Sequence, residues 1–178
     1  IDAAYKMLQA KGTLSGQNFS YDLTDFTRQA FTDYANFLLK AINEAATKND
    51  TEAYAQRRDA YLQLILDLDE LLNTNQSFML GRWTNLARGI ADEANGTTES
   101  DKQWLELNNA RTLITTWGDR DAAESGGLRD YSYREWGGML KDFYYKRWKA
   151  FFDARDNGST SPNWFDNDWS WAHDASLS

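Results

Sequence analysis

Hydrophobic residues recur along the chain at the three- and four-residue spacing of an α-helix. The first long stripe follows Asp22, a suitable N-cap, and runs to Ile42. A second stripe follows Asp50, another suitable N-cap, and runs to Leu72. We therefore predict two long helices in the first part of the chain, after a Gly-, Ser- and Asn-rich linker over residues 11–20.

Two further helices are predicted in the middle of the chain. One carries aromatic and aliphatic residues from position 78 onward and stops near Asn95 and Gly96. The next begins at a capping box formed by Ser100 and Gln103, and Gly118 ends it.

The last long helix is predicted to begin at a second capping box, Ser132 with Glu135, and to end at Asn157 and Gly158. No segment shows the alternation of hydrophobic and polar residues that is typical of β-strands. The only proline is Pro162, and a near-absence of proline suits long helices. The sequence thus predicts an all-α fold, an up-and-down bundle or array of about five to six helices. We expect residues 1–178 to form a single helical domain.

Composition narrows the classes of partner. The formal net charge is −8, which disfavours nucleic acid and anionic membranes as partners. No apolar run approaches the roughly 18–20 residues that a membrane span needs. The sequence contains no cysteine, so a disulfide framework and a thiolate metal site are both excluded.

Candidate catalytic groups are scarce. His173 is the only histidine, which argues against a catalytic triad and against a two-histidine metal site. Asp119, Asp121 and Glu124 lie in a polar, glycine-flanked segment that gives no reason for the buried, raised-pKa carboxyl group of a glycosidase. We therefore expect no catalytic residue, no metal and no cofactor within this chain.

Several strings in the sequence occur together in an order typical of one family. Residues 21–30 read YDLTDFTRQA, residues 78–83 read FMLGRW, and residues 116–118 read TWG. Residues 128–131 read LRDY and residues 144–148 read YYKRW. Each string alone is weakly specific. Their ordered set, which covers nearly the whole chain from Tyr21, resembles the α-N-acetylglucosaminidases of glycoside hydrolase family 89.

The resemblance implies a place in a larger enzyme. Family members are exo-acting, retaining glycosidases in which a small N-terminal domain and a TIM-like barrel precede an all-helical C-terminal domain. The chain resembles most of that last domain, whereas the two catalytic glutamates belong to the barrel. The isolated chain is therefore expected to be inactive, with the enzyme's own catalytic barrel as its partner.

The family also implies a substrate and a location. The substrates are glycans that end in α-linked N-acetylglucosamine, in heparan sulfate for animal members and in mucin-type glycans for bacterial ones. Such enzymes are lysosomal in animals and secreted or periplasmic in bacteria.

The resemblance places four residues in one wall of the substrate pocket: Trp117, Leu128, Asp130 and Tyr131. Aromatic rings suit the C–H face of a sugar, and polar groups suit its hydroxyls. Structural roles compete for three of these residues. Trp117 continues a core stripe, Tyr131 fits a hydrophobic staple with Trp136, and Asp130 is an alternative N-cap.

Other aromatic and basic residues are interpreted as structural. Arg28 and Arg147, each among aromatic residues, are expected to make ion pairs or cation–π contacts. Four tryptophans are assigned to the core: Trp83, Trp104, Trp136 and Trp148.

Two further hypotheses compete with the pocket wall. One is a free-standing carbohydrate-binding module, which would use the tryptophans near the C-terminus, Trp164, Trp169 and Trp171. The other is a helical scaffold that binds a foreign protein through an exposed apolar face.

Overall fold

The predicted all-α class is confirmed. The computed structural model describes residues 2–108, 120–121, 130, 133–159 and 164–174. Within these ranges lie seven α-helices, one short 3-10 helix and one π-helix, and the only β-type pairing is an isolated bridge between Met79 and Gly137. None of the described helices is both long and apolar enough to cross a membrane. The chain divides into two compact units, Ile1–Phe78 and Met79–Ser178.

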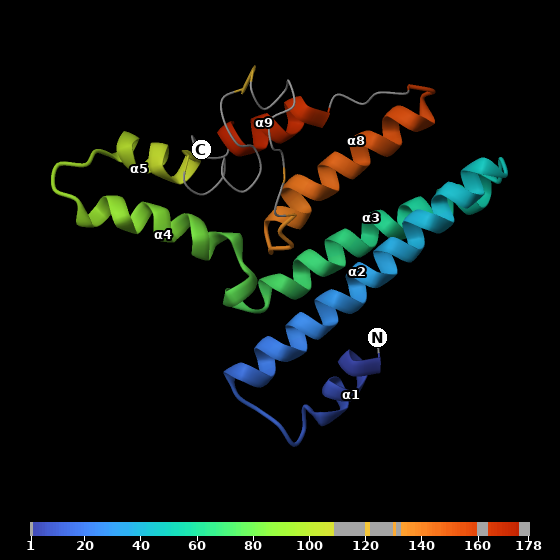
Figure 1. Ribbon diagram of the computed structural model, residues 1–178, viewed down its shortest axis with the longest axis horizontal. Helices are drawn as coiled ribbons and strands as arrows, with labels where there is room; N and C mark the ends of the chain where they lie inside the picture. The colour runs from blue at the N-terminus through green and yellow to red at the C-terminus, as the bar shows by residue number, and fades with distance from the viewer. Residues whose placement is uncertain (1, 109–119, 122–129, 131–132, 160–163, 175–178) are drawn as a thin grey trace. The chain divides into compact units, whose positions relative to one another are not determined.

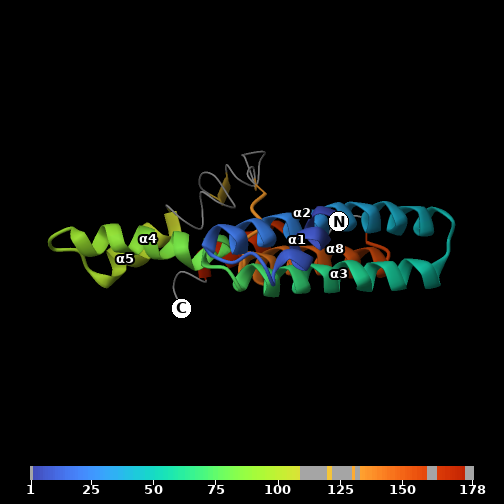
Figure 2. The ribbon, with the colours of Figure 1, turned by 90° about the horizontal axis from the view of Figure 1, so that it is seen from below.

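The first unit is built on two long helices, α2 (Gln17–Thr47) and α3 (Thr51–Asn73), which lie side by side (Figures 1 and 2). Their facing sides bury apolar residues at helical spacing, and the predicted N-cap at Asp50 is confirmed, since its carboxylate accepts a hydrogen bond from the Ala53 amide at 3.0 Å. The buried apolar residues are Leu38, Ile42, Ala45, Tyr61, Ile65, Leu68 and Leu72.

The start of the first long helix was predicted wrongly. Helix α2 begins at Gln17, after Gly16 with a φ of 113°, so Asp22 lies inside the helix and is not its N-cap. The residues predicted as linker thus contribute the first turn of α2. Helix α1 (Asp2–Ala10) contacts α2, and the short 3-10 helix η1 (Gln76–Phe78) follows α3.

The second unit opens with a helical hairpin, α4 (Leu80–Glu93) and α5 (Glu99–Glu106). The capping box lies two residues earlier than predicted: Thr98, and not Ser100, is the N-cap of α5, and Asp101 completes the box. The Thr98 hydroxyl accepts from the Asp101 amide, while the Asp101 carboxylate accepts from the Thr98 amide at 2.7 Å. The predicted end of α4 near Gly96 agrees with the structure.

The last long helix also begins later than predicted. Residues 133–136 are not helical, so the capping box of Ser132 with Glu135 does not open this helix. Gly138 has a φ of 92°, which favours glycine, and the Gly137 carbonyl accepts from the Leu80 amide at 3.0 Å. This bond satisfies one of the free N–H groups in the first turn of α4.

Beyond Gly138 the chain forms the π-helix η3 (Leu140–Tyr144), which continues into α8 (Tyr145–Asp156). Met139, Leu140, Phe143, Tyr144 and Phe152 are all buried. Helix α9 (Trp164–Asp174) packs on both α8 and η3. As predicted, Asn157 and Gly158 end the long helix: Asp156 is its last residue, Asn157 is its C-cap, and Gly158 follows with a φ of 72°.

Candidate functional site

Only one of the four predicted pocket residues falls among the residues that the structure describes. Trp117, Leu128 and Tyr131 lie outside them, so their pocket role stays a prediction. Asp130 is described, and it is the last residue before Tyr131 in the sequence.

The Asp130 side chain is held from two directions. Its carboxylate accepts a hydrogen bond of 2.6 Å from the Tyr144 hydroxyl at Oδ1 and another of 2.6 Å from Arg147 Nη1 at Oδ2. The side chain is only 9% exposed. The backbone of Asp130 has a φ of 50°, a left-handed conformation that Asp tolerates better than most residues do. Asp130 is therefore tied to the end of η3 and the first turn of α8.

Arg147 joins this aspartate to a second one on α9. Its Nη2 atom donates to Asp168 Oδ2 at 2.7 Å, and its Nε atom lies 3.1 Å from the same oxygen. Asp168 is buried, and the Arg147 side chain is 13% exposed. The guanidinium also lies 4.5 Å from the centre of the Phe143 ring. The expected structural role of Arg147, in ion pairs and cation–π contacts, is confirmed.

We refer to Asp130, Tyr144, Arg147 and Asp168 as the aspartate clamp. Burial acts to lower the pKa of Arg147, but the hydrogen bonds and charges of Asp168 and Asp130 outweigh it and raise that pKa above its usual range. Burial, together with the charge and hydrogen bond of Asp130, raises the pKa of Tyr144 far above its usual range. Both side chains therefore keep their protons and act as donors to the carboxylates, not as acids or bases.

Two members of the clamp were not identified from the sequence. Tyr144 is one of many aromatic residues in its part of the sequence, and Asp168 lies among the polar residues near the C-terminus. The usable signal is the short string from Tyr144 to Arg147, in which a tyrosine and an arginine three residues apart share one helix face. No local spacing points to Asp168, because its partner lies 21 residues away.

The tryptophans behave differently from one another. Trp83 and Trp104, which were predicted to lie in the core, are 43% and 62% exposed, so this prediction is wrong for both. Trp171, one of the proposed sugar-binding residues of the C-terminal tail, packs with its ring 5.0 Å from that of Phe143. The Arg120 guanidinium lies 6.0 Å from the ring of Trp169. These contacts favour a packing role for the two described rings on α9.

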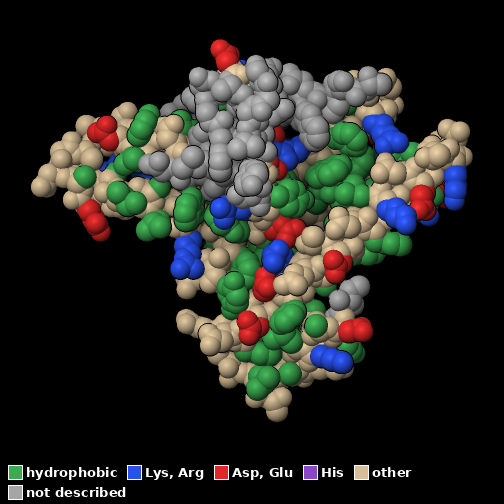
Figure 3. All heavy atoms as spheres, in the orientation of Figure 1, with side chains coloured by type: hydrophobic (Ala, Val, Ile, Leu, Met, Phe, Trp, Pro, Cys, Tyr) green, Lys and Arg blue, Asp and Glu red, His purple; other side chains and the backbone are tan. Residues whose placement is uncertain are grey.

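The exposed tryptophans belong to a wider apolar surface. On α4, Trp83, Leu86 and Ile90 follow one another at helical spacing and are 43–62% exposed. Space-filling spheres show hydrophobic side chains at the surface over α4 and α5, and again around α1 in the first unit (Figure 3). Exposed apolar side chains that share one helix face are typical of regions that another protein surface covers.

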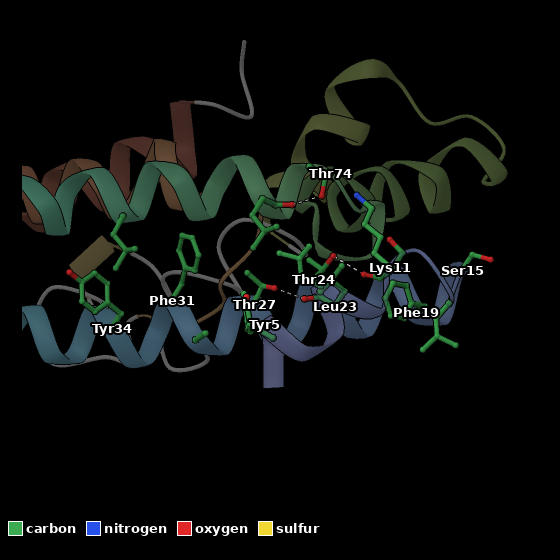
Figure 4. Close-up of a pocket in the computed structure, with 17 residues that line it drawn as sticks. Tyr5, Lys11, Ser15, Phe19, Leu23, Thr24, Thr27, Phe31, Tyr34 and Thr74 are labelled. Carbon is green, nitrogen blue, oxygen red and sulfur yellow. Dashed lines mark hydrogen bonds between the residues drawn. The ribbon is translucent and has the colours of Figure 1, made fainter. Parts of the chain in front are cut away.

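An apolar pocket of about 760 Å³ lies within the first unit, between α1, α2 and α3 (Figure 4). Phe31 and Thr24 point from α2 toward α3 in this view, and among the described residues that line the pocket Lys11 is the only charged one. The described lining is mostly apolar, a composition that suits apolar contact. Across the described parts of both units, no group of three or more acidic or histidine side chains is placed to hold a metal ion.

Comparison with known proteins places the chain in a family. Residues 1–175 match the model of the α-N-acetylglucosaminidase (NAGLU) C-terminal domain. Human α-N-acetylglucosaminidase is 29% identical over 138 residues, which cover 76% of this chain and 17% of the human protein.

Solved structures of a family 89 glycoside hydrolase from Clostridium perfringens give the same relationship. In its complex with 2-acetamido-1,2-dideoxynojirmycin the enzyme is 28% identical to this chain, with a TM-score of 0.84 over 96% of the chain and 20% of the enzyme. A variant with two glutamate-to-glutamine substitutions, bound to its substrate GlcNAc-α-1,4-galactose, is 29% identical, with a TM-score of 0.79 over 96% of this chain and 19% of that enzyme. The chain thus spans about a fifth of the length of these relatives, and it belongs to the family of C-terminal domains of the α-N-acetylglucosaminidases of glycoside hydrolase family 89.

Proposed function

We propose that this helical chain packs on the catalytic barrel of an exo-acting, retaining α-N-acetylglucosaminidase and forms one wall of its substrate pocket. The observation that carries the proposal is the family match over residues 1–175, because it equates nearly the whole chain with one domain of a much longer enzyme. The catalytic glutamates then lie in the barrel. The substrate complex of the C. perfringens enzyme carries two glutamate-to-glutamine substitutions, which supports a pair of glutamates as the catalytic groups.

Two features of the chain support a covered position. The apolar side chains exposed on α4 suit burial against another part of the same enzyme. The aspartate clamp holds Asp130, which immediately precedes Tyr131 in the sequence. Tyr131 is one of the residues that the resemblance assigns to the pocket wall. The substrate is a glycan with a terminal α-linked N-acetylglucosamine, the unit present in the substrate bound to the C. perfringens variant.

The wall is tested by substitutions in the full-length enzyme that carries this domain. Trp117→Ala should lower kcat/KM more than it lowers the melting temperature, because it removes a ring contact to the sugar. Tyr131→Phe should leave the melting temperature near normal and reduce kcat/KM about tenfold, through loss of one hydrogen bond to the sugar.

Contrary results would point to structural roles. If Trp117→Ala unfolds the domain while the remaining folded enzyme keeps its kcat/KM, and if Tyr131→Phe behaves as wild type, the two residues are packing residues only. The pocket-wall proposal would then be abandoned.

The isolated chain provides a second test. It should not hydrolyse an aryl α-N-acetylglucosaminide, and it should bind N-acetylglucosamine oligosaccharides very weakly, since most of the pocket is contributed by the barrel. Strong binding by the isolated chain, measured by calorimetric titration, would favour a free-standing carbohydrate-binding module instead.

A further inference from the structure

The sequence contains two asparagine–glycine pairs, Asn95–Gly96 and Asn157–Gly158, and each pair follows the end of a helix. An asparagine before a glycine can lose its side-chain amide without an enzyme, because glycine has no Cβ to keep its backbone nitrogen away from the asparagine side chain. In a folded protein the rate of this reaction depends on what holds the two residues. The structure holds the two pairs differently.

The pair Asn157–Gly158 is held by the last turn of α8. Asn157 is the C-cap, and its Nδ2 atom donates a hydrogen bond of 2.9 Å to the Asp153 carbonyl. The Gly158 amide, whose nitrogen would be the nucleophile, donates to the Arg155 carbonyl at 3.0 Å. Both reacting groups are therefore engaged by carbonyls of the helix, and the reaction requires this turn to open first.

The pair Asn95–Gly96 lies in the turn that joins α4 to α5 (Figure 1). The turn is anchored on either side of the pair, because the Ala94 amide and the Thr97 hydroxyl both donate to the Ala91 carbonyl, at 3.2 and 2.6 Å. Asn95 and Gly96 themselves are exposed, and among the described residues neither the Asn95 side chain nor the Gly96 amide has a hydrogen-bond partner.

The turn also has room for the two reacting groups to meet. Gly96 has a φ of 84°, and a Cβ built at this position would meet no atom within 4 Å. The backbone nitrogen of Gly96 can therefore approach the Asn95 side chain without displacing a neighbour and without breaking a hydrogen bond of its own.

We propose that Asn95 is a site of spontaneous deamidation, whereas Asn157 is protected by the end of α8. The Gly96 nitrogen attacks Cγ of Asn95, and as the new N–C bond forms the bond from Cγ to Nδ2 breaks. The amide proton of Gly96 leaves with Nδ2 as ammonia, and a five-membered succinimide remains. Water then adds to either carbonyl of the ring, which gives aspartate or isoaspartate at position 95.

The modified hairpin should stay folded. The new carboxylate lies three residues before Thr98, the N-cap of α5, where negative charge is favourable to the helix. The anchors at Ala94 and Thr97 do not involve the side chain that changes. The product is therefore a folded protein with one additional negative charge in the α4–α5 turn.

Peptide mapping of the full-length enzyme tests the proposal. Trypsin cleaves after Arg88 and Lys102, so Asn95 is the only asparagine in the peptide of residues 89–102, and Asn157 falls in another peptide. The enzyme is incubated at mildly alkaline pH, and mass spectrometry of the digest follows conversion of each amide to the acid. We expect Asn95 to react at least about tenfold faster than Asn157.

Enzyme unfolded in urea is the control, because both pairs then have the same immediate neighbour and no helix to protect them. In urea the two asparagines should react at rates within about threefold of each other. Asn95→Gln is the matched variant, since glutamine would have to close a larger, less favoured ring. It should abolish the acidic species that ion-exchange chromatography resolves in the aged enzyme.

Two results would overturn the proposal. One is a similar rate at Asn95 and Asn157 in the folded enzyme, which would show that the bonds at the end of α8 do not protect. The other is an Asn95 rate that is at least about tenfold lower in the folded enzyme than in urea, which would show that the α4–α5 turn prevents ring closure.

Discussion

Both units of this chain pack helices against one another, but different features stabilise the packing in each. The first unit relies on length: α2 and α3 bury an aliphatic stripe along their contact, and their turn is closed by one capping aspartate. The second unit uses shorter helices, a π-helix and a buried ionic cluster. Regular packing tolerates many sequences, whereas the second arrangement depends on a few particular side chains.

The largest expected difference concerns the arginines. Arg147→Met leaves two buried carboxylates without their shared cation, and we expect a loss of about 3–5 kcal/mol in the free energy of unfolding. Arg28→Met in α2 is the control, since Arg28 pairs with Asp25 in the same helix at 27% exposure and should cost about 0–1 kcal/mol. Thermal unfolding followed by circular dichroism measures both. Equal losses in the free energy of unfolding for the two variants would contradict the proposed difference between the two units.

A core substitution measures what regular packing contributes in the first unit. Leu72→Ala, at a residue with 0% exposure, should cost about 2–5 kcal/mol through lost burial and the cavity that remains. Leu72→Met, which conserves volume, should cost less than about 1.5 kcal/mol. Urea denaturation gives both values, and a large cost for the methionine variant would show that the hairpin is as demanding as the clamp.

Glycine substitutions test how far backbone conformation matters in the second unit. Gly138→Ala should lower the free energy of unfolding by about 1–2 kcal/mol, because alanine is strained at the φ of 92° that this position requires. An added Cβ would lie 3.8 Å from its nearest neighbour, so it would not clash, and backbone strain is the main cost. Gly89→Ala, inside α4 with open space around it, should instead stabilise by about 0.5–1 kcal/mol. In thermal unfolding, Gly138→Ala should lower the melting temperature and Gly89→Ala should raise it. An unchanged melting temperature for Gly138→Ala would contradict the role given to this turn.

The smallest expected effect is a pH dependence at the start of α5. Hydrogen bonds from the Thr98 amide and hydroxyl lower the pKa of Asp101 below 3.8. Because the pKa of Asp101 is lower in the folded state than in the unfolded state, the capping box stabilises the fold fully above the unfolded pKa. This stabilisation is lost as the pH falls through the folded pKa. An NMR titration of the Asp101 carboxyl carbon measures the shift directly. Thr98→Ala should return the midpoint toward 3.8, and an unchanged midpoint would contradict this cause.

Sequence reasoning succeeded where local signals and core periodicity coincide. The α2 and α3 stripes, the cap at Asp50 and the stop at Gly158 all follow from residues within one or two turns of one another. It failed at two capping boxes for a physical reason. Ser100 and Ser132 each have a suitable partner three positions later. In the first case Thr98, with Asp101 three positions later, has the same spacing and is the N-cap instead. In the second case Gly137 and Gly138 delay the start of the last helix.

The candidate site was less accessible to prediction. Asp130 was singled out from the resemblance as a residue of the pocket wall, and that role stays a prediction. Its partners in the structure, Tyr144 and Arg147, lie 14 and 17 residues away and were not predicted. Such partnerships are tertiary: they depend on how α8 and α9 pack, and no periodicity in the sequence encodes them. The exposure of Trp83 and Trp104 was missed because a stripe shows which residues share a helix face, and not what covers that face.

The π-helix has a consequence for insertions and deletions in this family. An α-helix turns by about 100° with each residue, so the wider turn of a π-helix is commonly the trace of one extra residue in a helix. Removing one residue between Leu140 and Tyr144 would let η3 become ordinary α-helix, and the segments on either side would keep nearly their present orientation, because the wider π turn already accommodates the extra residue. Relatives whose sequences lack a residue at this point should therefore present nearly the same entry to the helix, with an ordinary α turn in place of the π turn.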